Sequence, residues 1–223
     1  MLEDARTRFI INKELLSSSI LIELLEKKRY GVEYQPIIDI SNQNIYAFEC
    51  LARFFDHANK SIPPDAVFAS LHKSPLSLFQ VEYEQKILQL SNAPDYAKVF
   101  VNLDQDSYFS YCTQGVHNPF LELFSNYQRS DIIIELIENS EINDSKMSLA
   151  IIDDLSKNKI KTAIDDVFNP QSMISTSVIQ LANFIKLVLS HHCYVGSQPP
   201  YDKFYSLMVL TIGKEIYCAT NAR

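Results

Sequence analysis

The stretch KTAIDDVFNP, residues 161–170, contains the pattern on which the fold prediction depends. A short apolar run ends in two adjacent aspartates, Asp165 and Asp166, and Asn and Pro follow where a glycine-rich turn would be expected. Neighbouring carboxylates at the end of a buried strand repel each other unless a positive charge lies between them. A bound cation would supply that charge, so the stretch predicts a strand that ends at a metal site. Capping of the next helix by the aspartates is the alternative interpretation.

From Gly31 onward, similar apolar runs alternate with segments of helical period. The predicted strands are residues 32–40, 45–54, 98–104, 131–138, 161–167, 184–189 and 215–220. The segments between them carry helix signals, such as the prolines before an acidic first turn in SIPPDAVFASLHK. Strands separated by helices predict βα units around a parallel sheet, and therefore an α/β fold.

The first thirty residues form a separate helical segment in this prediction. Residues 3–29 follow the helical period and place Leu15, Ile22 and Leu25 on one stripe. The helix either packs on the domain that follows or serves as a signalling linker or dimer helix. We therefore expect an N-terminal helical segment over residues 1–30 and one barrel domain over residues 31–223.

Composition excludes several classes of protein. A formal charge of −7 over 223 residues argues against a nucleic-acid polymer as partner. No apolar run approaches the roughly 20 residues that span a bilayer, so no membrane span is expected. The four cysteines lie far apart and form no CxxC pair, which favours reduced thiols in a cytoplasmic protein over disulfides or a zinc site.

Polar residues able to bind metal or phosphate stand near the ends of successive predicted strands. In a β/α barrel the carboxyl ends of the strands open onto one face, where the active site lies. Carboxylate and amide oxygens suit Mg²⁺, Mn²⁺ or Ca²⁺. Taken singly, each residue has an ordinary explanation as a surface ion pair, a turn former or a helix cap. Their recurrence on successive strands favours a common metal site; the residues are Glu49, Asn102, Glu135, Glu138, Asp165, Asp166 and Lys186.

These residues and their flanking motifs, taken in order, resemble the EAL domain family of bacterial cyclic di-GMP phosphodiesterases. The resemblance runs from about Tyr30 to the end of the chain. The ordered set is more specific than any one of its members. It consists of YQPI (34–37), ECLAR (49–53), SIPPDAVF (61–68), VNLD (101–104), ELIE (135–138), AIDD (163–166) and Lys186.

The resemblance implies a fold, a ligand and a set of roles. The implied fold is a TIM-like β/α barrel whose first strand runs antiparallel to the others. Two Mg²⁺ or Mn²⁺ ions, for which Ca²⁺ would be an inhibitory occupant, hold the water that cleaves cyclic di-GMP to pGpG. The implied metal ligands are Glu49, Asn102, Glu135, Asp165 and Asp166. Lys186 and Glu138 have catalytic roles, positioning the water and supporting the ligand shell, and Gln35 and Arg53 hold the nucleotide.

The sequence departs from the family pattern after the aspartate pair. Residues 167–170 replace a Phe-Gly-Thr-Gly loop, and Pro170 restricts φ where glycine would be free. Val188 stands in place of the Asp of the Lys-Ile-Asp motif, and Thr220 in place of the glutamate expected as general base. No eighth strand is expected after residue 220, so the barrel is expected to be incomplete at its C-terminal end. Either the chain is cut there, or the N-terminal helix or a partner covers the open edge.

Three functions fit this pattern. The favoured one is a cyclic di-GMP signalling protein that binds divalent metal, cyclic di-GMP or both, with weak or no hydrolysis. The first alternative is an active phosphodiesterase, so enzymatic activity stays open. The second is a degenerate scaffold that acts through protein–protein contacts, as a homodimer or with a regulatory partner.

Overall fold

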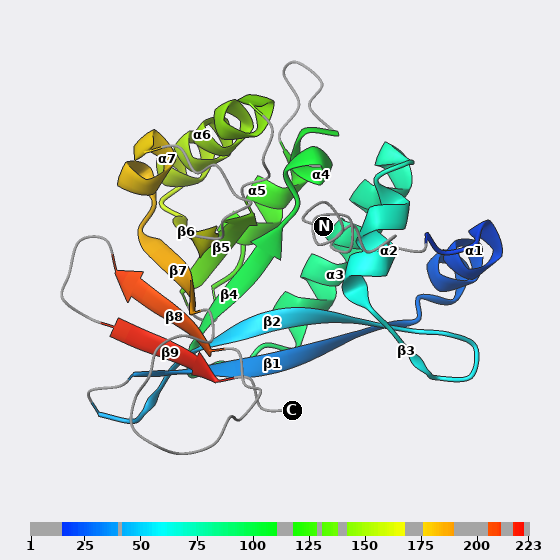
Figure 1. The fold of residues 1–223 in the computed structure, drawn as a ribbon, viewed down its shortest axis with the longest axis horizontal. Helices are drawn as coiled ribbons and strands as arrows, with labels where there is room; N and C mark the ends of the chain where they lie inside the picture. The colour runs from blue at the N-terminus through cyan, green and yellow to red at the C-terminus, as the bar shows by residue number, and fades with distance from the viewer. Residues whose placement is uncertain are drawn as a thin grey trace, which may run out of the picture.

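The structure is a computed structural model that describes residues 15–39, 42–110, 118–128, 131–137, 142–167, 176–189, 205–210 and 216–220. Its helices are α1 (Ser18–Lys27), α2 (Pro64–Leu71), α3 (Pro75–Ser91), α4 (Gln105–Ser110), α5 (Pro119–Ser125), α6 (Ile142–Lys157) and α7 (Thr176–Leu181). Its strands are β1 (Tyr30–Asp39), β2 (Ile45–Phe55), β3 (Ser61–Ile62), β4 (Lys98–Leu103), β5 (Ile132–Ile137), β6 (Lys161–Val167), β7 (Phe184–Leu189), β8 (Tyr205–Leu210) and β9 (Ile216–Thr220) (Figure 1).

The strands form one sheet in the order β1-β9-β8-β7-β6-β5-β4-β2-β3, and β1 also pairs with β2. Strands β2, β4, β5, β6 and β7 run parallel to their neighbours in this series, whereas β1 is antiparallel to β2. Helices α3 to α7 lie outside the sheet between these strands (Figure 1). The TIM-like β/α fold with an antiparallel first strand is therefore confirmed.

The C-terminal end departs from a regular β/α barrel. Among the described residues no helix follows β7, and β8 and β9 each run antiparallel to the preceding strand. Strand β8 was not predicted, although YSLMVL is an apolar run of strand length. Strand β9 pairs with β1 through Ile37–Asp39 and Tyr217–Ala219. The two antiparallel strands β8 and β9 therefore lie between β7 and β1, at the C-terminal end where the barrel was expected to be incomplete.

An apolar layer fills the interior of the barrel. Because side chains alternate along a strand, every second residue of each strand points inward. The inward residues form a buried cluster of Ile37, Ala47, Phe100, Ile133, Ala163 and Phe184. The rings of Phe100 and Phe184 meet edge to face with their centroids 5.4 Å apart. This layer is the floor of the barrel mouth described below.

Within the described residues, the predicted helix over residues 3–29 is limited to α1, which spans Ser18–Lys27. Ser17 caps α1 by accepting from the backbone N–H of Ile20, and residues 15–17 are not helical. The predicted stripe is wrong for Leu15 and Ile22, which are 45% and 54% exposed, whereas Leu25 is partly buried against the core. Leu24 is the buried residue, packed in a cluster with the α2 and β2 side chains. Residues 3–14 of the predicted helix lie outside the described part of the chain.

Within the described residues, none of the helices combines the length and apolar character that a bilayer span requires.

Candidate metal centre

A polar layer lies directly above the apolar layer of the barrel. On each strand that contributes an inward apolar residue, a polar residue lies two positions away on the side of the mouth. The same face of a strand repeats every second residue, so these side chains share the interior of the barrel. The polar layer consists of Gln35, Glu49, Asn102, Glu135, Asp165 and Lys186.

Lys186 lies at the centre of this layer, among three carboxylates. Its Nζ is 2.8 Å from Oε1 of Glu49, 3.3 Å from Oδ2 of Asp165 and 3.6 Å from Oε1 of Glu135. One carboxylate oxygen from each of the three acidic residues lies within 4.8 Å of the others. Three strands that are far apart in sequence therefore bring their carboxylates to a single point.

Burial shifts the pKa values of the charged groups in this cluster. Burial alone would lower the pKa of Lys186, but the carboxylates of Glu135, Glu49 and Asp165 outweigh it and raise that pKa. Glu135 is fully buried, and burial together with the neighbouring Glu49 and Asp165 raises its pKa despite the opposing effect of Lys186. One ammonium therefore does not compensate three carboxylates.

The donor set fits a divalent cation. Both carboxylate oxygens of Glu135 are buried without a hydrogen-bond partner, so they have unused capacity to coordinate an ion. Oxygen ligands of this kind suit Mg²⁺, Mn²⁺ or Ca²⁺. A divalent ion would also offset the negative charge that Lys186 leaves uncompensated.

Asn102 and Gln35 are placed beside the carboxylates by strand register. Asn102 on β4 pairs with Glu135 on β5, and its half-buried position lies on the inward face. Gln35 on β1 is opposite Glu49 on β2. Strand register thus places Asn102 next to Glu135, and its role as a metal ligand stays a prediction.

Arg53 does not reach the carboxylate cluster. It follows Glu49 by four residues, about 13 Å farther along β2. Its guanidinium pairs with Glu33, with Nη2 2.6 Å and Nε 2.8 Å from Oε2. A third contact is the hydrogen bond that Nη1 donates to the carbonyl of Ala52. Arg53 is partly exposed on the ribbon of β1 and β2 that extends beyond the barrel toward β3 (Figure 1).

Several predicted residues fall outside the described side chains. Asp166 belongs to β6 and Val188 to β7, but only their backbone is described. Thr220 ends β9, where its backbone pairs with Tyr205. The remaining positions named from the sequence, Glu138 and the loop residues 168–170, lie outside the described residues.

A buried polar network on α3, which was not predicted from the sequence, supports the mouth. Glu82 and Lys86 form a buried ion pair of 2.9 Å, and Oε1 of Glu82 accepts the backbone N–H of Asp104, at the end of β4. Gln89 donates to the carbonyl of Cys50, the residue after Glu49. The i,i+4 spacing of Glu82 and Lys86 was visible in the sequence, but spacing alone does not distinguish a buried pair from an exposed one.

Cys50 itself points away from the mouth. It is a free, fully buried thiol in the cluster between the sheet and the helices. Burial and the nearby Glu135 and Glu49 raise its pKa to about 12, against the opposing effect of Lys86. The thiol stays protonated at neutral pH, which agrees with its prediction as a reduced structural cysteine.

Several solved structures of known proteins are similar to this chain. The PaMucR phosphodiesterase in complex with c-di-GMP is 18% identical, with 75% of this chain and 70% of that chain covered and a TM-score of 0.54. Bacillus subtilis YkuI, an EAL-domain protein in complex with substrate c-di-GMP and calcium, is 18% identical over 75% of this chain and 42% of that chain, with a TM-score of 0.58. Klebsiella pneumoniae BlrP1, a manganese and cyclic di-GMP complex, is 16% identical over 69% and 38%, with a TM-score of 0.51.

The chain spans less than half of the YkuI and BlrP1 chains, and at these identities the likeness is one of fold. A comparison with curated proteins found no match. A family model described as the EAL domain matches residues 18–195. That match covers most of the sequence, so the chain belongs to the EAL domain family.

Proposed function

We propose that this chain is a cyclic di-GMP signalling protein that binds a divalent cation and cyclic di-GMP at the barrel mouth, with weak or no hydrolysis to pGpG. The observation that carries the proposal is the buried group of Glu49, Glu135 and Asp165 around Lys186. Family membership and the ligands named for PaMucR, YkuI and BlrP1 support cyclic di-GMP as the partner.

The residues at the barrel mouth have different roles in the proposed function. Glu49, Glu135 and Asp165, with Asn102 beside them, would hold Mg²⁺ or Mn²⁺, which supplies charge stabilisation at a phosphoryl group and lowers the pKa of a bound water. Lys186 holds the carboxylates at one point and would help to position a water for attack. Phe100 and Phe184 close the floor beneath them and exclude bulk water.

Weak hydrolysis is proposed from the departures in sequence. Thr220 stands where the family pattern places a carboxylate base, and a threonine hydroxyl cannot accept a proton near neutral pH as a carboxylate can. Val188 removes a second carboxylate two residues after Lys186. Loss of a general base typically lowers a rate by about 10²- to 10⁴-fold, whereas binding does not depend on that base.

An active phosphodiesterase is the second candidate. It is favoured by the described ligand set, in which one oxygen of each of the three carboxylates lies within 4.8 Å of the others, beside Lys186. Incubation with cyclic di-GMP and Mg²⁺ or Mn²⁺, followed by chromatography for pGpG, separates the two candidates. We expect ligand binding in calorimetry with little pGpG.

Brisk turnover that is lost in Glu49→Gln would instead establish the enzyme. Absence of binding with and without metal would contradict both candidates and leave a scaffold role.

Arg53 is proposed to contact a phosphate of the dinucleotide, since a guanidinium fork matches phosphate oxygens. Arg53→Ala should weaken cyclic di-GMP binding by about 10- to 100-fold, the value of charge-assisted hydrogen bonds. Glu33→Gln should strengthen it by up to about fivefold, because the exposed Arg53–Glu33 pair competes with the ligand. Calorimetric titration measures both effects.

The matched control is Glu23→Gln, which breaks the similarly exposed pair with Arg29 on the N-terminal side and should leave the affinity unchanged. Equal affinities in the Arg53→Ala and unmodified proteins would remove Arg53 from the binding site.

A further inference from the structure

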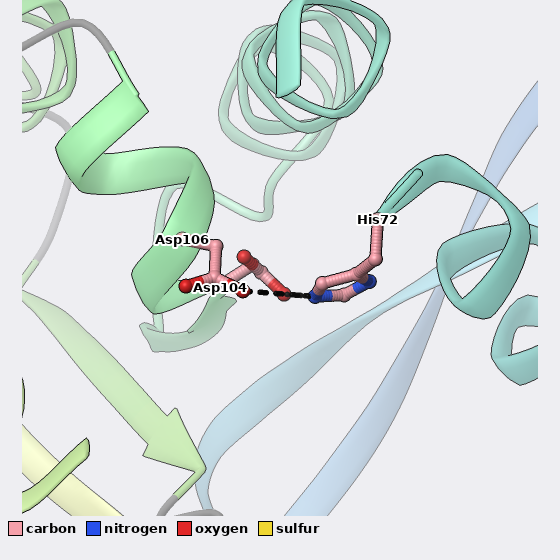
Figure 2. Close-up of side chains that lie close together, drawn as sticks. All are labelled: His72, Asp104 and Asp106. Atoms are coloured by element: carbon pink, nitrogen blue, oxygen red, sulfur yellow. Dashed lines mark ion pairs between the residues drawn. The ribbon is translucent and has the colours of Figure 1, made fainter. Parts of the chain in front are cut away.

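A second cluster of ligand-type side chains lies outside the barrel interior, between α2 and α4. His72 follows the last residue of α2, Asp104 occupies the turn between β4 and α4, and Asp106 lies in the first turn of α4. Figure 2 shows the imidazole directed at the two carboxylates across the space between these elements. The sequence analysis did not single out any of these three residues as a site.

The three side chains lie at distances suited to a shared ion. Nε2 of His72 is 3.0 Å from Oδ2 of Asp104 and 3.7 Å from Oδ2 of Asp106. One ligand atom from each residue lies within 4.8 Å of the others. In a tetrahedral zinc site with bonds of about 2.0–2.1 Å, neighbouring ligand atoms are about 3.3 Å apart. The observed separations lie on either side of that value.

The hydrogen bond at the far side of the imidazole selects the ligand nitrogen. Nδ1 of His72 is 2.7 Å from the carbonyl oxygen of Phe68, which can only accept, so Nδ1 carries a proton. In the neutral ring Nε2 then presents a lone pair to Asp104, and two acceptors at 3.0 Å repel each other. Either a second proton or a cation must lie between them. A backbone carbonyl on Nδ1 is also the usual orienting contact of a metal-bound histidine.

The surroundings of Asp104 favour added positive charge. Its Oδ1 accepts the backbone N–H of Ser107, which holds the carboxylate in place. Glu82 lies against Asp104 from the buried side, where its Oε1 accepts the backbone N–H of Asp104. Lys86 forms a short ion pair with Glu82, and Asp106 adds a further carboxylate at the open side.

We propose that His72, Asp104 and Asp106 form a second divalent-cation site, distinct from the barrel mouth, for an ion that accepts nitrogen as well as oxygen ligands, such as Zn²⁺. Mg²⁺ and Ca²⁺ favour all-oxygen sites, whereas imidazole with carboxylates suits zinc. His72 and Asp106 are 37% and 64% exposed, so the fourth position is open to water. The bound ion would tie the end of α2 to the turn after β4, the strand that carries Asn102. This site does not depend on cyclic di-GMP.

Zinc titration of the full chain tests the site, with Asp165→Asn as the starting protein so that the barrel mouth contributes little. We expect one Zn²⁺ per chain by calorimetry, and Co²⁺ should give visible absorption bands. His72→Gln should lower Zn²⁺ affinity by at least about 100-fold, since even outer contacts of a metal ligand are worth 10- to 100-fold. Asp106→Asn should also lower it, and being exposed it should not impair folding.

Two matched controls use residues outside the cluster. His57→Gln and Asp65→Asn change the same residue types at exposed or half-exposed positions, and both should leave Zn²⁺ affinity unchanged. Zn²⁺ should raise the unfolding temperature of the starting protein but not of its His72→Gln derivative. Undiminished Zn²⁺ affinity in His72→Gln, or no Zn²⁺ binding by the starting protein, would overturn the proposal; the latter would leave a protonated His72 in a simple ion pair.

Discussion

Replacing Lys186 with methionine is expected to lower the free energy of unfolding of the metal-free protein by about 3–5 kcal/mol, the usual cost of removing one partner from a buried ion pair. Methionine is unbranched like lysine and shorter only by the terminal ammonium, so the substitution leaves the buried Glu49 and Glu135 and the partly buried Asp165 together without a cation. Urea denaturation in the presence of a chelator measures the change. Mg²⁺ or Mn²⁺ should then restore more stability to the variant than it adds to the unmodified protein.

The variant should also become less stable as the pH rises. The pKa of Glu135 is already raised in the folded protein, so above the ordinary glutamate value of about 4.5 the folded state holds more protons than the unfolded state. Stability therefore falls as the pH rises toward the folded pKa. Removal of Lys186 extends this effect because it removes the main opposing charge.

Lys98→Met is the matched control for this experiment. Lys98 begins strand β4, at the opposite end of the barrel from Lys186, and its ammonium lies over the ring of Tyr46. We expect a much smaller loss of stability and no specific rescue by divalent ions. Equal losses in the two variants would mean that Lys186 does not compensate the carboxylates.

Asp165→Asn is expected to lower the affinity of the barrel mouth for Mg²⁺ by at least about 100-fold. The amide keeps the shape of the side chain but removes a charged ligand, and even outer contacts of a metal ligand are worth 10- to 100-fold. The measurement is a Mg²⁺ titration by calorimetry in a His72→Gln background, so that the outer cluster does not contribute. Cyclic di-GMP affinity in the presence of Mg²⁺ should fall with it.

The control for Asp165→Asn is Asp153→Asn, which removes an exposed aspartate on α6 that pairs with Lys157. Mg²⁺ affinity should be unaffected in this variant. If Asp165→Asn binds Mg²⁺ as tightly as its parent, the metal centre, and with it the proposed function, has no support.

Much of the metal centre could be predicted because strand periodicity is a local property. Glu49, Asn102, Glu135, Asp165 and Lys186 each stand near the carboxyl end of an apolar run, and a parallel barrel brings such ends to one face. Their grouping around Lys186 agrees with the predicted common mouth. The role of each as a metal ligand stays a prediction.

Other features could not be predicted because they depend on long-range pairing. Strand β8 is one apolar run among several, and its antiparallel pairing with β7 and β9 follows from the neighbours available in the fold. Ile22 is exposed and Leu24 is buried instead, because the packing of α1 against α2 and β2 selects the buried face. Helical period alone defines a stripe but not its partner.

Residue spacing along each strand is enough to set which side chains face into the barrel and to show that acidic ones recur at its mouth, because side chains alternate along a strand. The tertiary structure alone decided which charges meet. It placed Lys186 among three carboxylates, paired Arg53 with Glu33, and brought His72 to Asp104 across 32 positions of sequence. Such contacts depend on strand order, register and helix packing, since electrostatic energy depends on distance in space and not on distance along the chain.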